Sequence, residues 1–143
     1  MNNLADLEKK INSELATKIK FSEIKHNQLY LKIDCDNLLD VLTFLKNSSF
    51  TKFRQLVDIT AVDYPQEKKR FQLIYLLLSH EFNNRITLKY SINENEIIPS
   101  ITNIFPSANW MEREVFDMYG INFKNHPDLR RILTDYNFEG FPL

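Results

Sequence analysis

Cysteine and glycine are the scarcest features of this 143-residue chain, and their scarcity excludes several kinds of site. Cys35 is the one cysteine, which excludes an intrachain disulfide, a four-cysteine iron–sulfur cluster and a cysteine-rich zinc site. The two glycines, Gly120 and Gly140, cannot form a GxGxxG or GxxxxGK phosphate-binding loop. The usual cysteine-based metal motifs and glycine-based nucleotide motifs are therefore absent from the sequence.

Clustered histidines, long apolar runs and an excess of charge are also missing. His26, His80 and His126 lie far apart and show no HExxH pattern. The longest apolar run, LIYLLL at 73–78, has six residues, whereas a membrane-spanning helix needs about 20. The N-terminal MNNLADLEKKI is charged where a secretory signal would be apolar. Without such a signal or a membrane-spanning run, we expect an intracellular protein. A net charge of −1 provides no overall field that would attract nucleic acid or anionic lipid, so we expect no nucleic-acid binding.

What is present is the composition of a globular domain, with 43% hydrophobic residues and eleven phenylalanines. Hydrophobic periodicity predicts helices that begin near residues 4, 36, 96 and 110, and strands at 21–25, 29–33, 53–62, 70–79 and 86–92. This order favours a single α+β domain over residues 1–143, with helices packed on a mostly antiparallel or mixed sheet of about five strands. A C-terminal helical and extended segment, residues 107–143, completes it.

Local patterns give more detailed expectations for these elements. Asn3 with Asp6 resembles the start of the first helix, and Asp36 is expected to cap the second helix. RFQLIYLLLS (70–79) is nearly continuous in apolar residues, which predicts a strand covered on both faces. Isoleucines at helical spacing and Pro99 in the first turn predict a third helix over 96–105.

Residues 110–133, WMEREVFDMYGINFKNHPDLRRIL, are the densest in charge. Asn109 with Glu112 resembles a capping box, and Gly120 is placed to end the helix. On that helix the apolar residues are expected to share one side, with the charged residues toward the other: Met111, Val115 and Met118 against Glu112, Arg113 and Asp117. HPDLRRIL is predicted to begin another helical turn.

Four interpretations of these charges remain open from the residues alone. Glu112, Glu114 and Asp117 with His126 would form an acid–base or metal site of a stand-alone enzyme, although Glu114 lies about 200° round the helix from Glu112. The arginines of the segment would hold a phosphate or a lipid headgroup. The charges would instead be a solvated face or an internal salt-bridge network. Finally, clustered Trp, Tyr, Met and Arg are typical of a partner-binding patch.

A family resemblance adds to this picture. The run EREVFDMYGINFKNHPDLRRIL (112–133), followed by TDYNFEGFPL (134–143), resembles the C subunit of the proton-pumping NADH:quinone oxidoreductase, respiratory complex I, of bacterial or mitochondrial type. VDITAVDYP (57–65) and FPSANW (105–110) are similar to that family too. The resemblance covers at least residues 53–143. An equivalent subunit of a related membrane-bound hydrogenase remains an alternative.

The resemblance implies a non-catalytic structural subunit of the hydrophilic arm, in an enzyme that transfers electrons from NADH to quinone and translocates protons. It implies no cofactor in this chain, with FMN and iron–sulfur clusters in partner subunits. The expected partners are the large quinone-site subunit and the neighbouring iron–sulfur subunits. The expected partner-binding residues, with no catalytic or metal residue among them, are Glu112, Arg113, Glu114, Asp117, Met118, Tyr119, Gly120, His126, Pro127, Asp128, Leu129, Arg130 and Arg131.

The resemblance also implies a cellular location, and the sequence departs from the family pattern at one point. Membrane association would be indirect, through the complex, on the cytoplasmic side of an inner membrane or the matrix side of a mitochondrial one. Members of the family usually continue past the FEGFPL-like run into a tail over the neighbouring subunit, whereas this sequence stops at Leu143. Some partner-binding surface is therefore expected to be missing from this chain.

Overall fold

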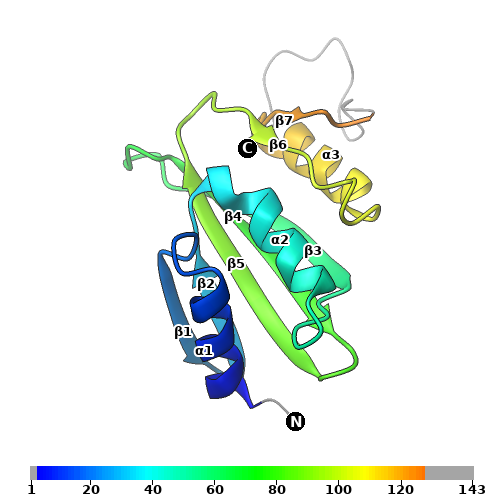
Figure 1. The fold of residues 1–143 in the computed structure, drawn as a ribbon. Coiled ribbons are helices and arrows are strands. Elements are labelled where there is room, and N and C mark those ends of the chain that lie inside the picture. The colour runs from blue at the N-terminus through cyan, green and yellow to red at the C-terminus, as the bar shows by residue number, and fades with distance from the viewer. Residues whose placement is uncertain (1–2, 128–143) are drawn as a thin grey trace.

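The computed structural model describes residues 3–127, which form three α-helices, seven strands and one 3₁₀ helix (Figure 1). In chain order these elements are α1 (Leu4–Glu14), β1 (Phe21–Lys25), β2 (Gln28–Lys32), the 3₁₀ helix η1 (Cys35–Asn37), α2 (Leu38–Asn47), β3 (Gln55–Asp63), β4 (Phe71–Ser79), β5 (Asn84–Ile92), β6 (Ile98–Pro99), α3 (Ala108–Tyr119) and β7 (Phe123–Lys124).

Five strands form one mixed sheet in the order β1-β2-β5-β4-β3. The pairs β1–β2, β5–β4 and β4–β3 are antiparallel, whereas β2 and β5 run parallel. The parallel pair joins strands far apart in sequence, so α2 and the β3–β4 hairpin lie between them along the chain. This architecture confirms the predicted α+β class with a mixed sheet of five strands.

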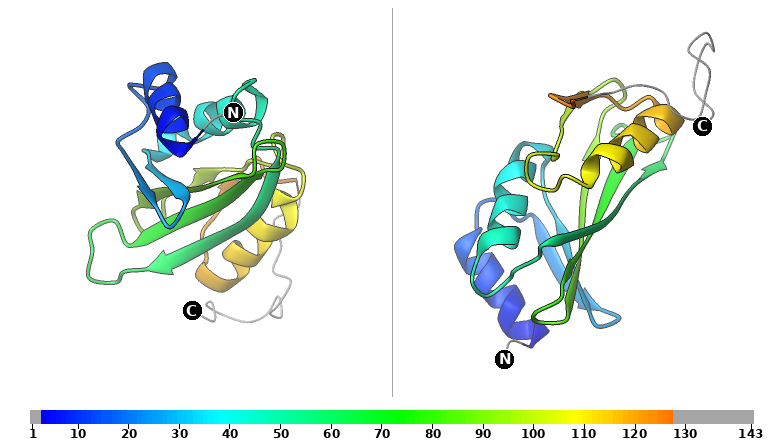
Figure 2. Two further views of the ribbon diagram at one scale, coloured as in Figure 1. Left: turned by 90° about the horizontal axis from the view of Figure 1, so that it is seen from below. Right: turned by 90° about the vertical axis from the view of Figure 1, so that its right-hand side faces the viewer.

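Helices α1 and α2 lie together on one side of the sheet, as both views of Figure 2 show. Asn3 Oδ1 accepts a hydrogen bond from the Asp6 N–H at 2.8 Å, so the predicted cap of α1 is confirmed. The predicted apolar stripe of α2 is confirmed as well, because four side chains are buried: Leu38, Val41, Leu42 and Leu45. The expected Asp36 cap is wrong: η1 precedes α2, and Asn37 is the N-cap without a side-chain bond.

Strand β4 is fully buried on one face only. Its odd-numbered residues from Phe71 to Ser79 are buried, and its even-numbered residues from Gln72 to Leu78 are half-buried. The prediction of a strand covered on both faces is therefore wrong. Within the buried face, the hydroxyls of Tyr75 and Tyr90 form a hydrogen bond at 2.7 Å, which satisfies two polar atoms inside the apolar core.

The predicted helix over 96–105 is wrong. Pro99 belongs to the short strand β6, which pairs in parallel with β7, and the Ser100 N–H donates to the Lys124 carbonyl at 2.9 Å. A tight turn follows, in which the N–H groups of Ile104 and Phe105 both donate to the Ile101 carbonyl. Ile98 and Ile101 are buried through this strand and turn, whereas Ile97 is exposed. A two-stranded edge tolerates the missing proline N–H.

Helix α3 packs against β3, at the end of the sheet away from α1 (Figures 1 and 2). Its Ala108 and Val115 belong to the same buried cluster as the residues under α1 and α2. The Tyr119 ring makes an edge contact with Phe71 at 6.1 Å between ring centroids. One hydrophobic core thus extends from α1 to α3 across the described residues. None of the helices within residues 3–127 is long and apolar enough to cross a membrane.

Candidate functional site

The candidate site is built on α3, whose ends are set by local sequence. Gly120 adopts φ 75° and its N–H donates to the Phe116 carbonyl, which confirms the predicted glycine stop. The N-cap is Ser107, so the predicted capping box of Asn109 with Glu112 is wrong. The helix begins at Ala108, two residues earlier than expected, and Glu112 faces inward.

Glu112 joins α3 to the loop after β6. Its side chain is fully buried, and its carboxylate accepts hydrogen bonds from the Ser100 hydroxyl at 2.6 Å and from the Ile101 N–H at 2.8 Å. Burial penalises the charged form and raises the pKa of Glu112 to about 7, although both hydrogen bonds oppose that rise. The carboxyl therefore titrates near neutral pH while it holds the loop in place.

His126 brings the segment after β7 to the same place. Its Nε2 lies 3.0 Å from the Asn109 carbonyl oxygen and 3.8 Å from Glu112 Oε1, and its side chain is buried. An N–H at Nε2 would donate to the Asn109 carbonyl. Glu112 and His126 thus tie β6, α3 and the segment after β7 together.

The inward position of the α3 carboxylates corrects the helix interpretation. Glu112 and Asp117 were expected on the polar side, away from the apolar residues, yet both are fully buried. The expectation assumed that charged residues mark the solvent side of a helix. Here the buried polar atoms of the Ser100–Ile101 loop supply hydrogen-bond partners for Glu112, which makes the burial of that carboxylate tolerable.

The outward side of α3 presents an aromatic and cationic surface. Trp110 is 54% exposed, and the guanidinium of Arg113 lies 5.6 Å from the centroid of its ring. The Nε of Arg113 is buried and has no hydrogen-bond acceptor within residues 3–127. Glu114 is exposed beside them. We call Trp110, Arg113 and Glu114 the α3 outer surface.

The thirteen expected partner-binding residues occupy different environments. Glu112 and Asp117 are buried, and Glu114 and Pro127 are exposed. Five are half-buried when backbone and side chain are taken together: Arg113, Met118, Tyr119, Gly120 and His126. The remaining four, Asp128, Leu129, Arg130 and Arg131, lie outside the described residues. Trp110 is not among these thirteen residues, although it is the tryptophan on which the interpretation of a partner-binding patch drew.

The enzyme interpretation needs several of these groups at one point. The structure brings Glu112 and His126 together but leaves Glu114 on the surface. Within residues 3–127, no three histidine, cysteine, aspartate or glutamate side chains are placed to hold a metal ion. Glu112 and His126 thus brace this segment from within, while Trp110, Arg113 and Glu114 lie on its outward side.

A small cavity of about 250 Å³ adjoins the end of α3, lined partly by Tyr119 and Gly120. Arg70 at its rim bonds both oxygens of Asp63, at 2.7 and 2.9 Å, and contacts Glu94 at 3.1 Å. The hydrogen bonds from Arg70 lower the pKa of Asp63. This cation is therefore already matched by carboxylates within the chain.

Comparison with known proteins agrees with the resemblance seen in the sequence. Residues 31–143 match the family model described as respiratory-chain NADH dehydrogenase, 30 Kd subunit. The C subunit of NADH-quinone oxidoreductase from Ruegeria pomeroyi is 54% identical over 121 residues, covering 85% of this chain and 60% of the relative. That of Ruegeria sp. (strain TM1040) is 47% identical over 140 residues, covering 98% and 70%. The chain thus spans about 60–70% of the length of these relatives.

Two solved structures share the fold. A trypsin-resistant fragment of Nqo5 superimposes with a TM-score of 0.73 at 27% identity, covering 86% of this chain and 98% of the fragment. A chain of the membrane-bound sulfane sulfur reductase, an archaeal respiratory membrane complex, gives a TM-score of 0.80 at 25% identity, covering 92% and 78%. From the matched length and these identities, the chain belongs to the family of the 30 Kd subunit of respiratory-chain NADH dehydrogenase.

Proposed function

We propose that this chain is a non-catalytic structural subunit of the hydrophilic arm of NADH:quinone oxidoreductase, where it braces the large quinone-site subunit. The observation that carries the proposal is the 47% identity over 140 residues to a relative named as the C subunit of NADH-quinone oxidoreductase. In this proposal the assembled enzyme transfers electrons from NADH to quinone and translocates protons. The chain takes part in that activity as a subunit, without catalytic residues of its own.

The geometry of α3 supports a bracing role. Glu112 and His126 fix the helix from within, so its outward residues are held at defined positions. Trp110 and Arg113 then offer a large aromatic area and a guanidinium, the residue types that dominate binding energy at protein interfaces.

Cofactors, partners and location follow as parts of the same proposal. FMN and iron–sulfur clusters would be held by partner subunits, consistent with the single cysteine here. The other contacts would be with the iron–sulfur subunits next to the quinone-site subunit. The chain would reach the inner membrane indirectly, through the complex, on its cytoplasmic side or, in an organelle, its matrix side.

The test is purification of the tagged chain from native membranes in mild detergent, with mass spectrometry of the proteins that accompany it. Recovery of flavin, iron–sulfur and quinone-site subunits in fixed ratio is the expected result. Recovery of the chain alone would contradict the proposal. Metal analysis of the purified chain addresses the stand-alone enzyme: stoichiometric bound metal would favour that alternative.

A second candidate is the equivalent subunit of a related membrane-bound assembly. The likeness to a chain of the membrane-bound sulfane sulfur reductase favours it, at a TM-score of 0.80. The same purification separates the two, because only the NADH-oxidising complex would bring a flavin subunit and NADH oxidation with it. Co-purification of the other membrane-bound assembly, without these, would replace the first proposal with the second.

A further inference from the structure

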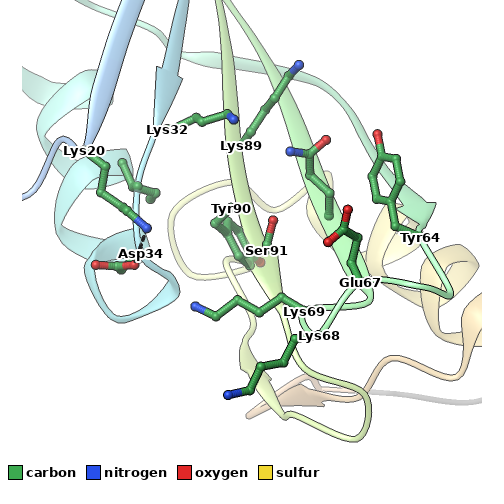
Figure 3. Close-up of a pocket in the computed structure, with 12 residues that line it drawn as sticks. Lys20, Lys32, Asp34, Tyr64, Glu67, Lys68, Lys69, Lys89, Tyr90 and Ser91 are labelled. Atoms are coloured by element: carbon green, nitrogen blue, oxygen red, sulfur yellow. Dashed lines mark ion pairs between the residues drawn. The ribbon is translucent and has the colours of Figure 1, made fainter.

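A lysine-lined groove of about 470 Å³ lies apart from α3, across the ends of β2, β5 and β4 (Figure 3). Five lysines line it from three parts of the chain: Lys20 before β1, Lys32 and Lys89 on β2 and β5, and Lys68 and Lys69 in the β3–β4 turn. Figure 3 shows Tyr90 and Ser91 of β5 between these groups, with Tyr64 at one side. We call these five lysines and the surface between them the lysine groove.

Positive charge in the lysine groove is only partly neutralised by the chain. Two carboxylates, Asp34 and Glu67, accompany the five lysines. Lys20 pairs with Asp34 at 3.2 Å, but the other four lysines have no ion pair within residues 3–127. The whole chain carries a net charge of −1, so this concentration of cations is a local property of one face.

Two of the lysines are direct neighbours in the sheet. Lys32 and Lys89 are register partners on the parallel strands β2 and β5. Like charges placed directly across two strands destabilise a sheet. The Lys89 amine also lies 5.6 Å from the centroid of the Tyr30 ring, which keeps it over the sheet. Such an unfavourable pair becomes favourable when a carboxylate from outside lies between the two amines.

We propose that the lysine groove binds an acidic segment of a partner protein. Lysines on long stems form a diffuse field that attracts carboxylates along a peptide. The residues that line the groove include no arginine and no glycine-rich loop, features that would focus a single phosphate. Exposed Tyr64 offers a ring against which apolar side chains of such a segment can pack. A concave surface also suits a peptide better than a flat lipid headgroup layer.

The partner would be another subunit of the respiratory complex, and that identity rests on the function proposed above. The groove shares no residue with the α3 outer surface. The chain would therefore contact its neighbours at two places, one aromatic and one electrostatic. The electrostatic contact is expected to weaken with salt, because exposed charges are screened beyond about 8 Å at physiological ionic strength.

The test uses the full 143-residue chain and a fluorescein-labelled, glutamate-rich peptide, with its glutamine analogue, tripolyphosphate and phosphatidylglycerol vesicles as competing probes. The glutamate peptide should bind, the glutamine analogue should not, and salt should weaken binding. Lys32→Gln/Lys89→Gln should bind about tenfold more weakly, since each exposed pair contributes modestly. Lys9→Gln/Lys25→Gln is the matched control, because both lysines are exposed and outside the groove, and it should bind as the original chain does.

Thermal melting is the second measurement. If the two lysines served only to stabilise the fold, their removal would lower the melting temperature. Removing the Lys32–Lys89 repulsion should leave the melting temperature of the double variant equal to or above that of the original chain. Absence of peptide binding, equal binding by the double variant, or binding of only tripolyphosphate or vesicles would overturn the proposal. Co-purification with the respiratory subunits without peptide binding would remove the groove proposal alone. Peptide binding without co-purification would overturn the proposed function and the identity of the partner, while the binding of an acidic segment in the groove would stand.

Discussion

The region of α1, α2 and the five-stranded sheet is held together differently from the region of residues 98–127. In the first, leucines and isoleucines fill the space between helices and sheet, and its buried polar side chains are uncharged. In the second, Glu112 and Asp117 are buried on one helix. The first region therefore supplies most of the stability. The second region uses buried carboxyl groups to fix the orientation of α3 and hence of its outer surface.

Loss of a core side chain in the first region should have the largest effect. Leu42→Ala removes a fully buried side chain under α2, which should lower the free energy of unfolding by about 3 kcal/mol through lost burial and the cavity that remains. Urea unfolding should give the same loss at acidic and neutral pH, because no ionisable group is involved. Leu39→Ala, at an exposed position on the same helix, should change stability by less than about 0.5 kcal/mol.

Titration of Glu112 should distinguish the second region. Its pKa is about 7 in the folded chain and near 4.5 when unfolded, so the folded state binds the proton more tightly. Stability from this group is present in full below about pH 4.5 and is lost as pH rises through about 7, by roughly 3 kcal/mol in total.

Glu112→Gln should remove this pH dependence, because an amide keeps an oxygen acceptor for the Ile101 N–H and does not titrate. The measurement is urea unfolding of both chains from about pH 5 to pH 8. Curves for the original chain and the variant that stay parallel over this range would mean that Glu112 does not control the second region.

A buried hydroxyl in the first region should have a smaller effect. Thr51 Oγ1 donates to the Leu45 carbonyl at 2.7 Å at the end of α2. Thr51→Val keeps the shape and removes the bond, which should cost about 1 kcal/mol in chemical unfolding. Thr51→Ser, which keeps the hydroxyl, should restore part of the difference if the hydrogen bond is responsible. A full loss in both variants would instead point to packing of the methyl group.

The sequence predicted most of the first region because its physics is local. The apolar periodicity of α1 and α2 reports directly which side of each helix is buried. The nearly continuous apolar sequence of β4 carries no such alternation, so its half-buried face was not predicted. Asn3 was predictable as a cap because its partner lies three residues away in sequence. The parallel pairing of β2 with β5 was not, because it depends on the path of the whole chain between them.

The second region was predicted less well because its contacts are distant in sequence. The pairing of β6 with β7, which replaces the expected helix over 96–105, joins Pro99 to Lys124. The burial of Glu112 depends on Ser100 and Ile101, whose polar atoms reach it only in the folded chain. The sequence around a charged residue on a helix does not show whether distant hydrogen-bond partners exist. The charged side of α3 was therefore predicted to face solvent.

The most direct test of the central claim compares two exposed side chains in the assembled complex. Trp110→Ala removes the 54% exposed ring from the α3 outer surface, and Leu39→Ala removes a 42% exposed side chain from α2. Each tagged variant is expressed in the native host, and native gels measure the amount of complete complex while thermal melts measure the isolated chain. The account predicts that the two isolated chains have the same melting temperature and that only Trp110→Ala lowers the amount of complete complex. Equal assembly of the two variants would contradict an interface at α3.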